Sequence, residues 1–182
     1  TFRNLDNVFD MSERCFFTYY ATQNIDKTEE YLQVCQNEYT LIASKIPEVA
    51  FSNIWIAQII ADKIPANSYV HLGIFNSLRS WNFTQLPSNV YSVCNVGGFG
   101  IDGTLSTVLG ASLVCPHRLH FVVLGDLAFF YDMNSLGNRY VGNNIRILLI
   151  NNGCGTEFRK YDHPCAKFKE NADPYMVASL KN

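Results

Sequence analysis

The sequence has little net charge and no run of basic residues. Its 182 residues carry 14 Lys and Arg against 16 Asp and Glu, which gives a formal net charge of −2. Such a chain offers no electrostatic basis for binding a nucleic acid backbone or an anionic membrane surface. No stretch has the apolar length of a membrane span, and the first residues lack the pattern of a secretory signal. We therefore expect neither a nucleic acid nor a membrane as a partner.

The cysteines lack the spacing of a disulfide framework or a metal site. No CxxC motif occurs, and no cysteine stands at metal-binding spacing from a histidine. The six are Cys15, Cys35, Cys94, Cys115, Cys154 and Cys165. Scattered cysteines are typical of reduced thiols in a cytosolic protein, so we expect a cytoplasmic location. A dinucleotide-binding domain is weakly supported as well, because no strand is followed by GxGxxG together with a ribose-binding acid.

What the sequence does contain is an alternation of apolar strands and helices. Strands are expected at residues 68–72, 90–94, 119–124 and 145–150, and the last two have the apolar runs of strands buried on both faces. Helices are expected at residues 52–64, where Ser52 is a good N-cap, at 104–114, and after Asp126, where Phe129, Met133 and Leu136 recur at helical spacing. This alternation predicts an α/β fold with a doubly wound, mainly parallel sheet and helices on both faces.

The first 50 residues have weaker patterns. Asp26 or Thr28 could cap a helix that runs to about Lys45 and ends before Pro47. The stretch before it, residues 4–22, is mixed and has no clean period. We interpret residues 1–50 as a linker or the helical tail of a preceding domain. Residues 51–182 would form the main domain, cut before its natural C-terminal end.

Two polar motifs follow the last two predicted strands. Asp126 comes directly after one and Asn152 directly after the next, so both are expected at the carboxyl ends of adjacent parallel strands, where open α/β sheets bind ligands. A carboxylate, an amide oxygen and the carbonyls of a glycine-rich loop are ligands suited to Mg²⁺, with substrate phosphates and water completing the shell. Backbone N–H groups at the start of the helix after Asp126 would face the same phosphates. The alternative is that each motif is an ordinary turn.

Gly125-Asp126 followed by Asn151-Asn152 resembles the signature of thiamine-diphosphate enzymes. The resemblance implies that Asp126 and Asn152 bind the divalent ion, Mg²⁺, that holds the cofactor diphosphate. The backbone carbonyl two residues further on, at Cys154, would complete the protein's share. Gly125, Leu127 and Ala128 are then expected to contact the cofactor.

The longer segments GDLAFFYDMNSL and GFGIDGTLSTVLGA resemble one branch of these enzymes. They are similar to the menaquinone-pathway synthases, which make 2-succinyl-5-enolpyruvyl-6-hydroxy-3-cyclohexene-1-carboxylate. By this resemblance Ile101 is the apolar wedge that bends the cofactor, and Gly100 offers its carbonyl to the aminopyrimidine. Asn76 and Ser77 would lie near the substrate and the diphosphate. Ile101, Asn76 and Ser77 each have an alternative interpretation as ordinary loop residues without a contact to ligand.

Two positions depart from the pattern of these synthases. An Arg that binds substrate carboxylate is replaced by Val96, and a second Arg is replaced by Trp81, with Arg79 as the nearest cation. Val and Trp cannot make a bidentate guanidinium–carboxylate contact. The resemblance therefore does not carry the substrates of these synthases across to this chain.

The resemblance implies a diphosphate-binding domain of an enzyme that decarboxylates a 2-oxo acid and transfers the acyl carbanion equivalent. The alternatives are an acetolactate-synthase-like or simple decarboxylase domain, or a non-catalytic relic that only binds cofactor. The activating Glu of this family sits on a pyrimidine-binding domain, and nothing here matches that domain. We therefore expect no catalytic residue in this chain, no activity from the chain alone, and a pyrimidine-binding partner within a dimer or larger assembly.

Overall fold

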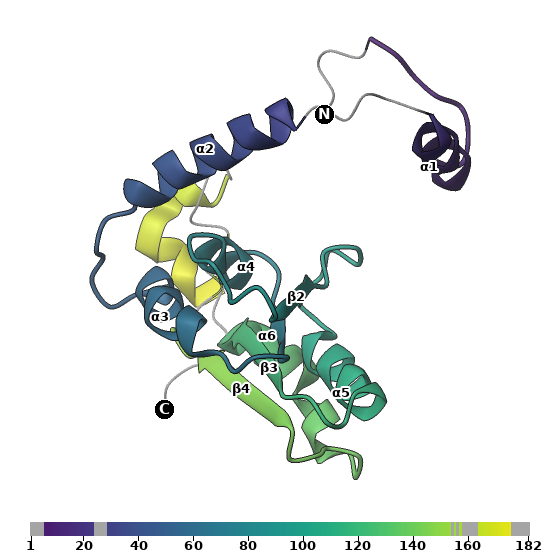
Figure 1. The fold of residues 1–182 in the computed structure, drawn as a ribbon. Coiled ribbons are helices and arrows are strands. Elements are labelled where there is room, and N and C mark those ends of the chain that lie inside the picture. Colours follow the sequence, from purple (N-terminus) through teal and green to yellow (C-terminus); the bar gives the residue numbers. More distant parts are fainter. Residues whose placement is uncertain (1–5, 24–28, 154, 156, 158–163, 176–182) are drawn as a thin grey trace. The chain divides into compact units, whose positions relative to one another are not determined.

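A computed structural model describes residues 6–23, 29–153, 155, 157 and 164–175 of the chain (Figure 1). The chain divides into two compact units, Thr1–Ser44 and Lys45–Asn182. The assignment of residues 1–50 to a linker or the tail of a preceding domain, and of residues 51–182 to the main domain, stays a prediction. Within the described ranges, no helix combines the length and the apolar character needed to cross a bilayer.

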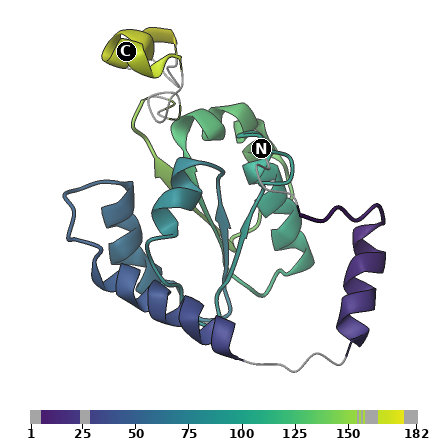
Figure 2. The same cartoon turned by 90° about the horizontal axis from the view of Figure 1, so that it is seen from above.

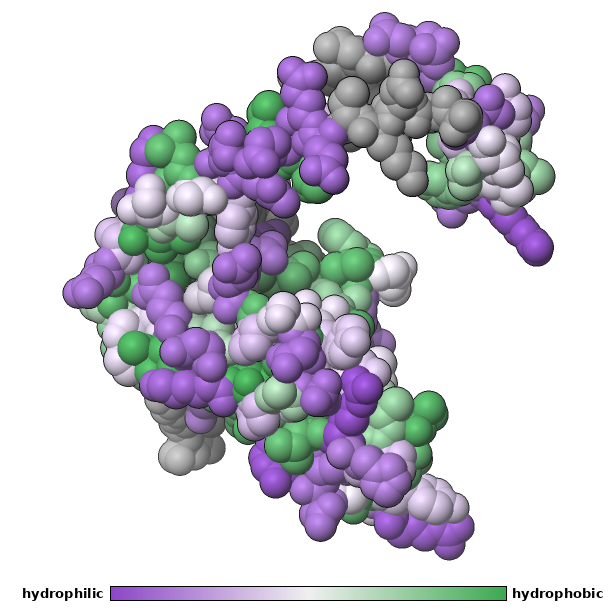
Figure 3. Space-filling view, viewed as in Figure 1, coloured by the Kyte–Doolittle hydropathy of each residue, from purple (hydrophilic) through white to green (hydrophobic). Residues whose placement is uncertain are grey.

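The first unit contains helices α1 (Glu13–Thr22) and α2 (Glu30–Ser44). The sequence did not predict α1, which begins at an N-cap, Ser12, whose side chain accepts a hydrogen bond from the Cys15 N–H at 3.3 Å. Helix α2 matches the expected range, although its predicted caps at residues 26 and 28 lie outside the described residues. No residue of either helix is buried, and Figure 3 shows hydrophobic residues of α2 mixed with hydrophilic ones at the surface.

The second unit is built on a sheet of four strands, all parallel, in the order β2-β1-β3-β4. The strands are β1 (Tyr69–Leu72), β2 (Tyr91–Cys94), β3 (His120–Gly125) and β4 (Ile145–Ile150). Each lies within one residue of its predicted range. The range of β3 follows from its apolar run, because this central strand is buried by the covering helices, whereas β2 is mostly exposed.

Helices cover both faces of this sheet, which confirms the predicted doubly wound α/β fold (Figure 2). Those packed on the first face are α3 (Asn53–Ile60), the short 3₁₀ helix η1 (Ala61–Lys63) and α4 (Asn76–Trp81). Those on the second face are α5 (Thr104–Val114), α6 (Asp126–Asp132) and the 3₁₀ helix η2 (Met133–Gly137). A further 3₁₀ helix, η4, spans Ala166–Tyr175. The two cores contain Val70, Leu72 and Trp81 on the first face, and Leu105, Val108 and Leu124 on the second.

Helix α3 begins as predicted, and the side it buries overlaps the expected one. The Ser52 hydroxyl accepts a hydrogen bond from the Trp55 N–H at 3.2 Å, which confirms the N-cap. The α-helix ends at Ile60 and continues as η1. Ala57, Ala61 and Ile64 are buried in the first core and Ile60 packs against it, whereas Ile59, expected on the same side from its spacing, is exposed. The small side chains of Ala57 and Ala61 let the helix approach the sheet and α4 closely.

Strand β4 corrects the prediction that it is buried on both faces. Its range is the predicted one, but Ile147 and Leu149 are exposed, whereas β3 is almost wholly buried. The physical reason is its place in the sheet: among the described strands β4 pairs only with β3 and forms an edge. Met133, predicted to face the core with Phe129 and Leu136, is also exposed, because the helix changes there from α to 3₁₀ geometry and rotates its side chains.

The connections leave two neighbouring strands toward opposite faces. Strand β1 is followed by α4 on the first face, and β3 is followed by α6 on the second. Strands β1 and β3 lie side by side. Such a reversal opens a crevice at the carboxyl ends of the two strands, the usual ligand-binding position in open α/β sheets.

Candidate functional site

A cavity of about 340 Å³ lies at this crevice. It is formed by the segments that follow β1 and β3, by the end of β4 and by the loop between β2 and α5. Its lining residues are Asn53, Ile74, Phe75, Asn76, Ser77, Phe99, Ile101, Gly125, Asp126, Leu127, Ala128, Ile150, Asn152, Gly155 and Glu157. Residues from five parts of the chain, among them Asn53 of α3, therefore meet at one site.

Most of the residues proposed from sequence lie in this one cavity. Those that line it are Asn76, Ser77, Ile101, Gly125, Asp126, Leu127, Ala128 and Asn152. Asn76 and Ser77 are the first residues of α4 rather than loop residues as predicted. Gly100 is not among the lining residues, and its carbonyl accepts a hydrogen bond from Asn95 Nδ2 at 3.1 Å. Cys154 lies outside the described residues.

The Asp126 carboxylate joins the ends of β3 and β4. It is only 2% exposed; one oxygen accepts the Leu127 N–H at 2.9 Å and the other accepts the Gly153 N–H at 2.6 Å. Gly153 has φ +76°, a left-handed conformation that a residue without a Cβ adopts at little cost. The glycine of the Asn-Asn-Gly motif thus allows the backbone to turn its N–H toward the carboxylate.

This donor set fits Mg²⁺. Asp126 and Asn152 supply a carboxylate and an amide oxygen to the same cavity, and hard oxygen ligands of this kind suit the ion. Each carboxylate oxygen of Asp126 has two lone pairs, so its bonds to the backbone leave positions for a metal. Within the described residues, no three His, Cys, Asp or Glu side chains gather in a way that could hold a metal by themselves. The site would need ligands from a bound diphosphate and water to complete the octahedron.

Two phenylalanines that sequence reasoning missed form part of the cavity wall. Phe75 and Phe99 have φ of 69° and 48°, which is costly for side chains with a Cβ, and their rings meet edge to face with centroids 5.6 Å apart. Phe99 stands in the glycine-rich loop 95–103, and glycines let a backbone approach a ligand closely, which is the one signal in the sequence that could have pointed to it. Phe75 gave no such signal, because its conformation follows from the tight turn between β1 and α4.

A charged pair lies at the same wall. Arg79 and Glu157 form a bidentate ion pair, in which Nη1 donates to Oε2 and Nη2 donates to Oε1 at 3.1 Å. The Arg79 guanidinium also lies 5.6 Å from the centre of the Phe75 ring. The pairing compensates the negative charge of Glu157, which lines the cavity. It also engages Arg79, the cation nearest to the position where the related synthases carry an Arg.

The two departures noted in the sequence have different surroundings. Trp81 is 5% exposed and packs in the first core, so it contributes packing and no ligand contact. Val96 is 49% exposed in the loop after β2. Neither position offers a cation to a substrate carboxylate.

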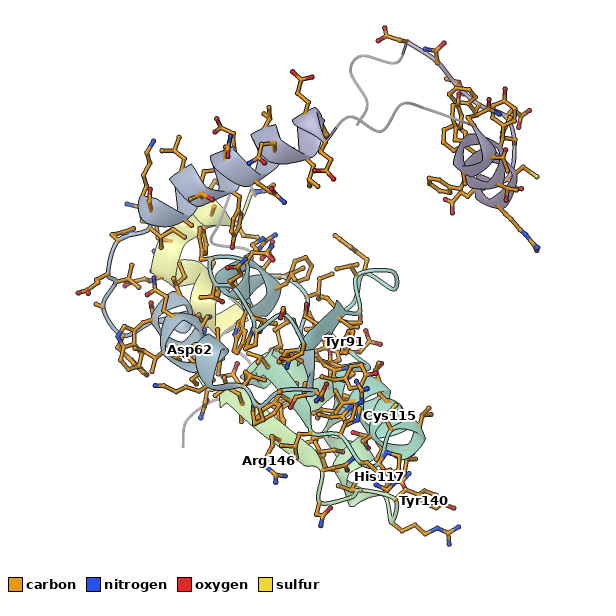
Figure 4. All side chains as sticks on the ribbon, viewed as in Figure 1. Asp62, Tyr91, Cys115, His117, Tyr140 and Arg146 are labelled. Atoms are coloured by element: carbon orange, nitrogen blue, oxygen red, sulfur yellow. The ribbon has the colours of Figure 1, made fainter. Side chains whose placement is uncertain are left out.

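The three histidines that the structure describes lie away from the cavity. His117 is exposed and precedes β3, so it lies at the end of the sheet opposite to the cavity, near Cys115 (Figure 4). His71 and His120 are buried in the sheet on the face covered by α5, and neither lines the large cavity. The fourth histidine, His163, lies outside the described residues.

Comparison with known proteins adds a consistent set of relatives. No protein-family model matches the chain. It is similar to the 2-succinyl-5-enolpyruvyl-6-hydroxy-3-cyclohexene-1-carboxylate synthase of Bacteroides fragilis, with 42% identity over 112 residues, or 62% of this chain and 20% of the relative. The synthase of the same name from Bacteroides thetaiotaomicron is 36% identical over 155 residues, 85% of this chain and 27% of the relative. That from Flavobacterium johnsoniae is 30% identical over 163 residues, 87% of this chain and 29% of the relative.

The matches cover most of this chain but a minor part of each relative. The chain spans about a fifth to three tenths of the length of these synthases. The resemblance that the motifs indicated is thereby confirmed: over that share of their length, the chain is a homologue of the 2-succinyl-5-enolpyruvyl-6-hydroxy-3-cyclohexene-1-carboxylate synthases.

Proposed function

We propose that this chain is the diphosphate- and Mg²⁺-binding part of a thiamine-diphosphate-dependent enzyme that decarboxylates a 2-oxo acid and transfers the acyl carbanion equivalent. The observation that carries the proposal is the one cavity that collects Asp126, Asn152 and the start of α6 at the reversal of the sheet. The similarity to the synthases supports the same function. When bound, thiamine diphosphate supplies the electron sink for the loss of carbon dioxide.

The polar side of the cavity would hold the metal and the diphosphate. Asp126 would provide the negative charge, and Asn152 an amide oxygen, while the Cys154 carbonyl is proposed from the resemblance alone. The hydrogen bonds from Leu127 and Gly153 fix the Asp126 carboxylate before any ligand arrives. Such preorganisation lowers the ordering cost of binding.

The apolar side would shape the site and exclude water. Ile74, Phe75, Phe99, Ile101 and Ile150 form this part of the wall. We assign Ile101 the role of the wedge beneath the organic part of the cofactor, because it also packs against the second core and is therefore held in place from behind. A wall held in this way can impose a bent shape on a ligand.

The chain alone would not complete the reaction. We propose that the activating Glu is supplied by a pyrimidine-binding domain, either elsewhere in the same protein or in a partner subunit of a dimer or larger assembly. The chain spans a minor part of the related synthases, which leaves room for such a domain. Without it the cavity would bind the diphosphate end of the cofactor and leave the other end in water.

A second candidate is an acetolactate-synthase-like or simple 2-oxo-acid decarboxylase activity. It is favoured by Val96, by the buried Trp81 and by the ion pair of Arg79, since none of these offers a guanidinium to a dicarboxylate acceptor. The two candidates are separated by assaying the protein together with its pyrimidine-binding domain. Product from 2-oxoglutarate and isochorismate would support the synthase reaction, and turnover of pyruvate alone would support the decarboxylase.

The binding site itself is tested by Asp126→Ala. Titration calorimetry with thiamine diphosphate in the presence of Mg²⁺ is expected to show at least a tenfold loss of affinity, because the change removes the charge that holds the metal. Asp62→Ala, which removes an exposed carboxylate on η1, is the matched control and should bind as the unchanged chain does (Figure 4). Unchanged affinity in Asp126→Ala would contradict the assignment, and no binding by the unchanged protein would contradict the proposed site altogether.

A further inference from the structure

Among the described residues two carboxylates line the cavity, and they are held by elements on opposite faces of the sheet. Asp126 begins α6 on the second face, where the N–H groups of Leu127 and Gly153 bind it. Glu157 follows β4 in the sequence, but its ion pair with Arg79 attaches it to α4 on the first face. The proposed metal site uses Asp126 and gives Glu157 no role.

The ion pair presents its negative member to the cavity. Glu157 lines the cavity, whereas Arg79 does not. Arg79 donates to both carboxylate oxygens of Glu157, and a bidentate pair of this kind fixes the orientation of the carboxylate. A ligand at this wall therefore meets a fixed negative charge, with the compensating positive charge behind it.

The surroundings of the pair are mainly aromatic. The ring of Phe75 lies under the Arg79 guanidinium and meets the ring of Phe99 edge to face, and both rings line the cavity. The Glu157 side chain is only 24% exposed, so its charge is incompletely screened by water. A second carboxylate on a ligand would be repelled here, while an alkyl group would contact the rings at no electrostatic cost.

We propose that Glu157, held by Arg79, is a specificity-determining residue that favours 2-oxo acids with an uncharged apolar side chain and disfavours those with a second carboxylate. The inference rests on the proposed function, from which it takes a 2-oxo acid as the ligand. Every 2-oxo acid has the carboxylate that is lost as carbon dioxide, so the discrimination acts on the far end of the molecule. Arg79 is the positioning residue, because it orients the Glu157 carboxylate and compensates its charge.

A pair with a purely structural role would behave differently. A partly exposed ion pair contributes little to folding stability, so either partner can be changed without unfolding the chain. If the pair only joined α4 to the segment after β4, Glu157→Gln and Arg79→Gln would have the same effect on ligands. If Glu157 selects the ligand, the two changes act in opposite directions, because one removes a negative charge from the wall and the other removes a positive charge.

Two matched ligands test the proposal. 2-Oxoglutarate and 2-oxopentanoate have the same five-carbon chain and differ only in whether its far end is a carboxylate or a methyl group. NMR titration of the chain, followed on the methyl groups of Ile101 and Ile150 in the cavity wall, gives both dissociation constants without any need for turnover. The titration is made with thiamine diphosphate and Mg²⁺ present and repeated without them. The unchanged chain should bind 2-oxopentanoate about tenfold more tightly than 2-oxoglutarate.

The variants should then change this ratio of affinities in opposite senses. Glu157→Gln should reduce the ratio about fivefold by tightening the binding of 2-oxoglutarate, and Arg79→Gln should increase it about twofold by weakening that binding. Arg79→Lys keeps the positive charge and should change the ratio less than Arg79→Gln does. Asp62→Asn, which removes the same charge as Glu157→Gln from an exposed position on η1, is the control and should leave the ratio unchanged.

The outcomes separate this inference from the proposed function. Equal affinities in the unchanged chain, tighter binding of 2-oxoglutarate, or a shift of the ratio in the same sense by Glu157→Gln and Arg79→Gln would overturn the inference alone. Binding of neither ligand at the cavity would overturn the inference and the proposed function together. The expected affinities, combined with no turnover of either 2-oxo acid by the protein together with its pyrimidine-binding domain, would support the role of Glu157 and contradict the proposed function.

Discussion

The carboxylate of Asp132 replaces a missing cap on helix α5. The N-cap residue of this helix is Gly103, which has φ 77° and no side chain to offer. Asp132, the last residue of α6, accepts the N–H of Ser106 at 2.7 Å and also accepts a hydrogen bond from the Ser106 hydroxyl. Ser106 is the third residue of α5, the position whose N–H an N-cap side chain normally satisfies. The cap therefore comes from a helix 26 residues further along the chain.

Asp132→Ala is expected to lower the free energy of unfolding by about 2 kcal/mol. Loss of a capping side chain costs about 1 kcal/mol. Removing a negative charge from a helix N-terminus costs up to about 1 kcal/mol more. Asp132→Asn keeps an acceptor for the Ser106 N–H and loses only the charge, so it should cost about half as much. For a domain of this size 2 kcal/mol corresponds to a fall in Tm of about 4–8 °C.

Urea denaturation and calorimetry of the chain measure both variants. Asp62→Ala, at the exposed carboxylate of η1, is the control and should change the free energy of unfolding by less than about 0.5 kcal/mol. High salt should reduce the difference between Asp132→Asn and the unchanged chain, since it screens the charge. The reasoning is refuted if Asp132→Ala is as stable as the control, or if Asn and Ala are equally damaging.

Two other predictions concern backbone conformation and pH. Gly153→Ala should lower the free energy of unfolding by about 1 kcal/mol or more, because φ +76° is strained for Ala. It should also weaken Mg²⁺ binding, because the N–H of residue 153 holds the Asp126 carboxylate. Gly110→Ala, in an open position on α5, should instead raise the free energy of unfolding by up to about 1 kcal/mol. Denaturation and calorimetric titration of the two variants would check this, and equal effects would contradict it. Burial, followed by the nearby His120, lowers the pKa of His71 from 6.5 to about 4, so the unfolded chain takes up a proton below pH 6.5 while the folded chain does not until about pH 4. Stability should therefore fall by up to about 3 kcal/mol as the pH drops from 6.5 to 4 and fall no further below that on account of His71. Denaturation at several pH values should show a flatter profile in His71→Gln, and an unchanged slope would contradict the assignment.

The sequence alone determined the four strands, several of the helices and the polar motifs of the site. Apolar runs located strands 119–124 and 145–150, Ser52 located the start of one helix, and the strand ends located Asp126 and Asn152. These features depend on local rules: a buried strand needs an apolar run, a helix start needs a cap, and a parallel strand presents its following turn at the carboxyl edge. They could be predicted because each rule acts over a few residues.

Only the tertiary structure decided which residues meet. The exposure of Ile147 follows from the strand order, which makes β4 an edge of the described sheet. The contact of Asp132 with Ser106 and the pairing of His71 with His120 join segments 26 and 49 residues apart. The entry of Phe75 into the large cavity depends on a backbone conformation that its residue type disfavours. Local patterns carry no information on strand order, on register between distant segments or on strain that the surrounding packing enforces, and those three physical factors set the walls of the site.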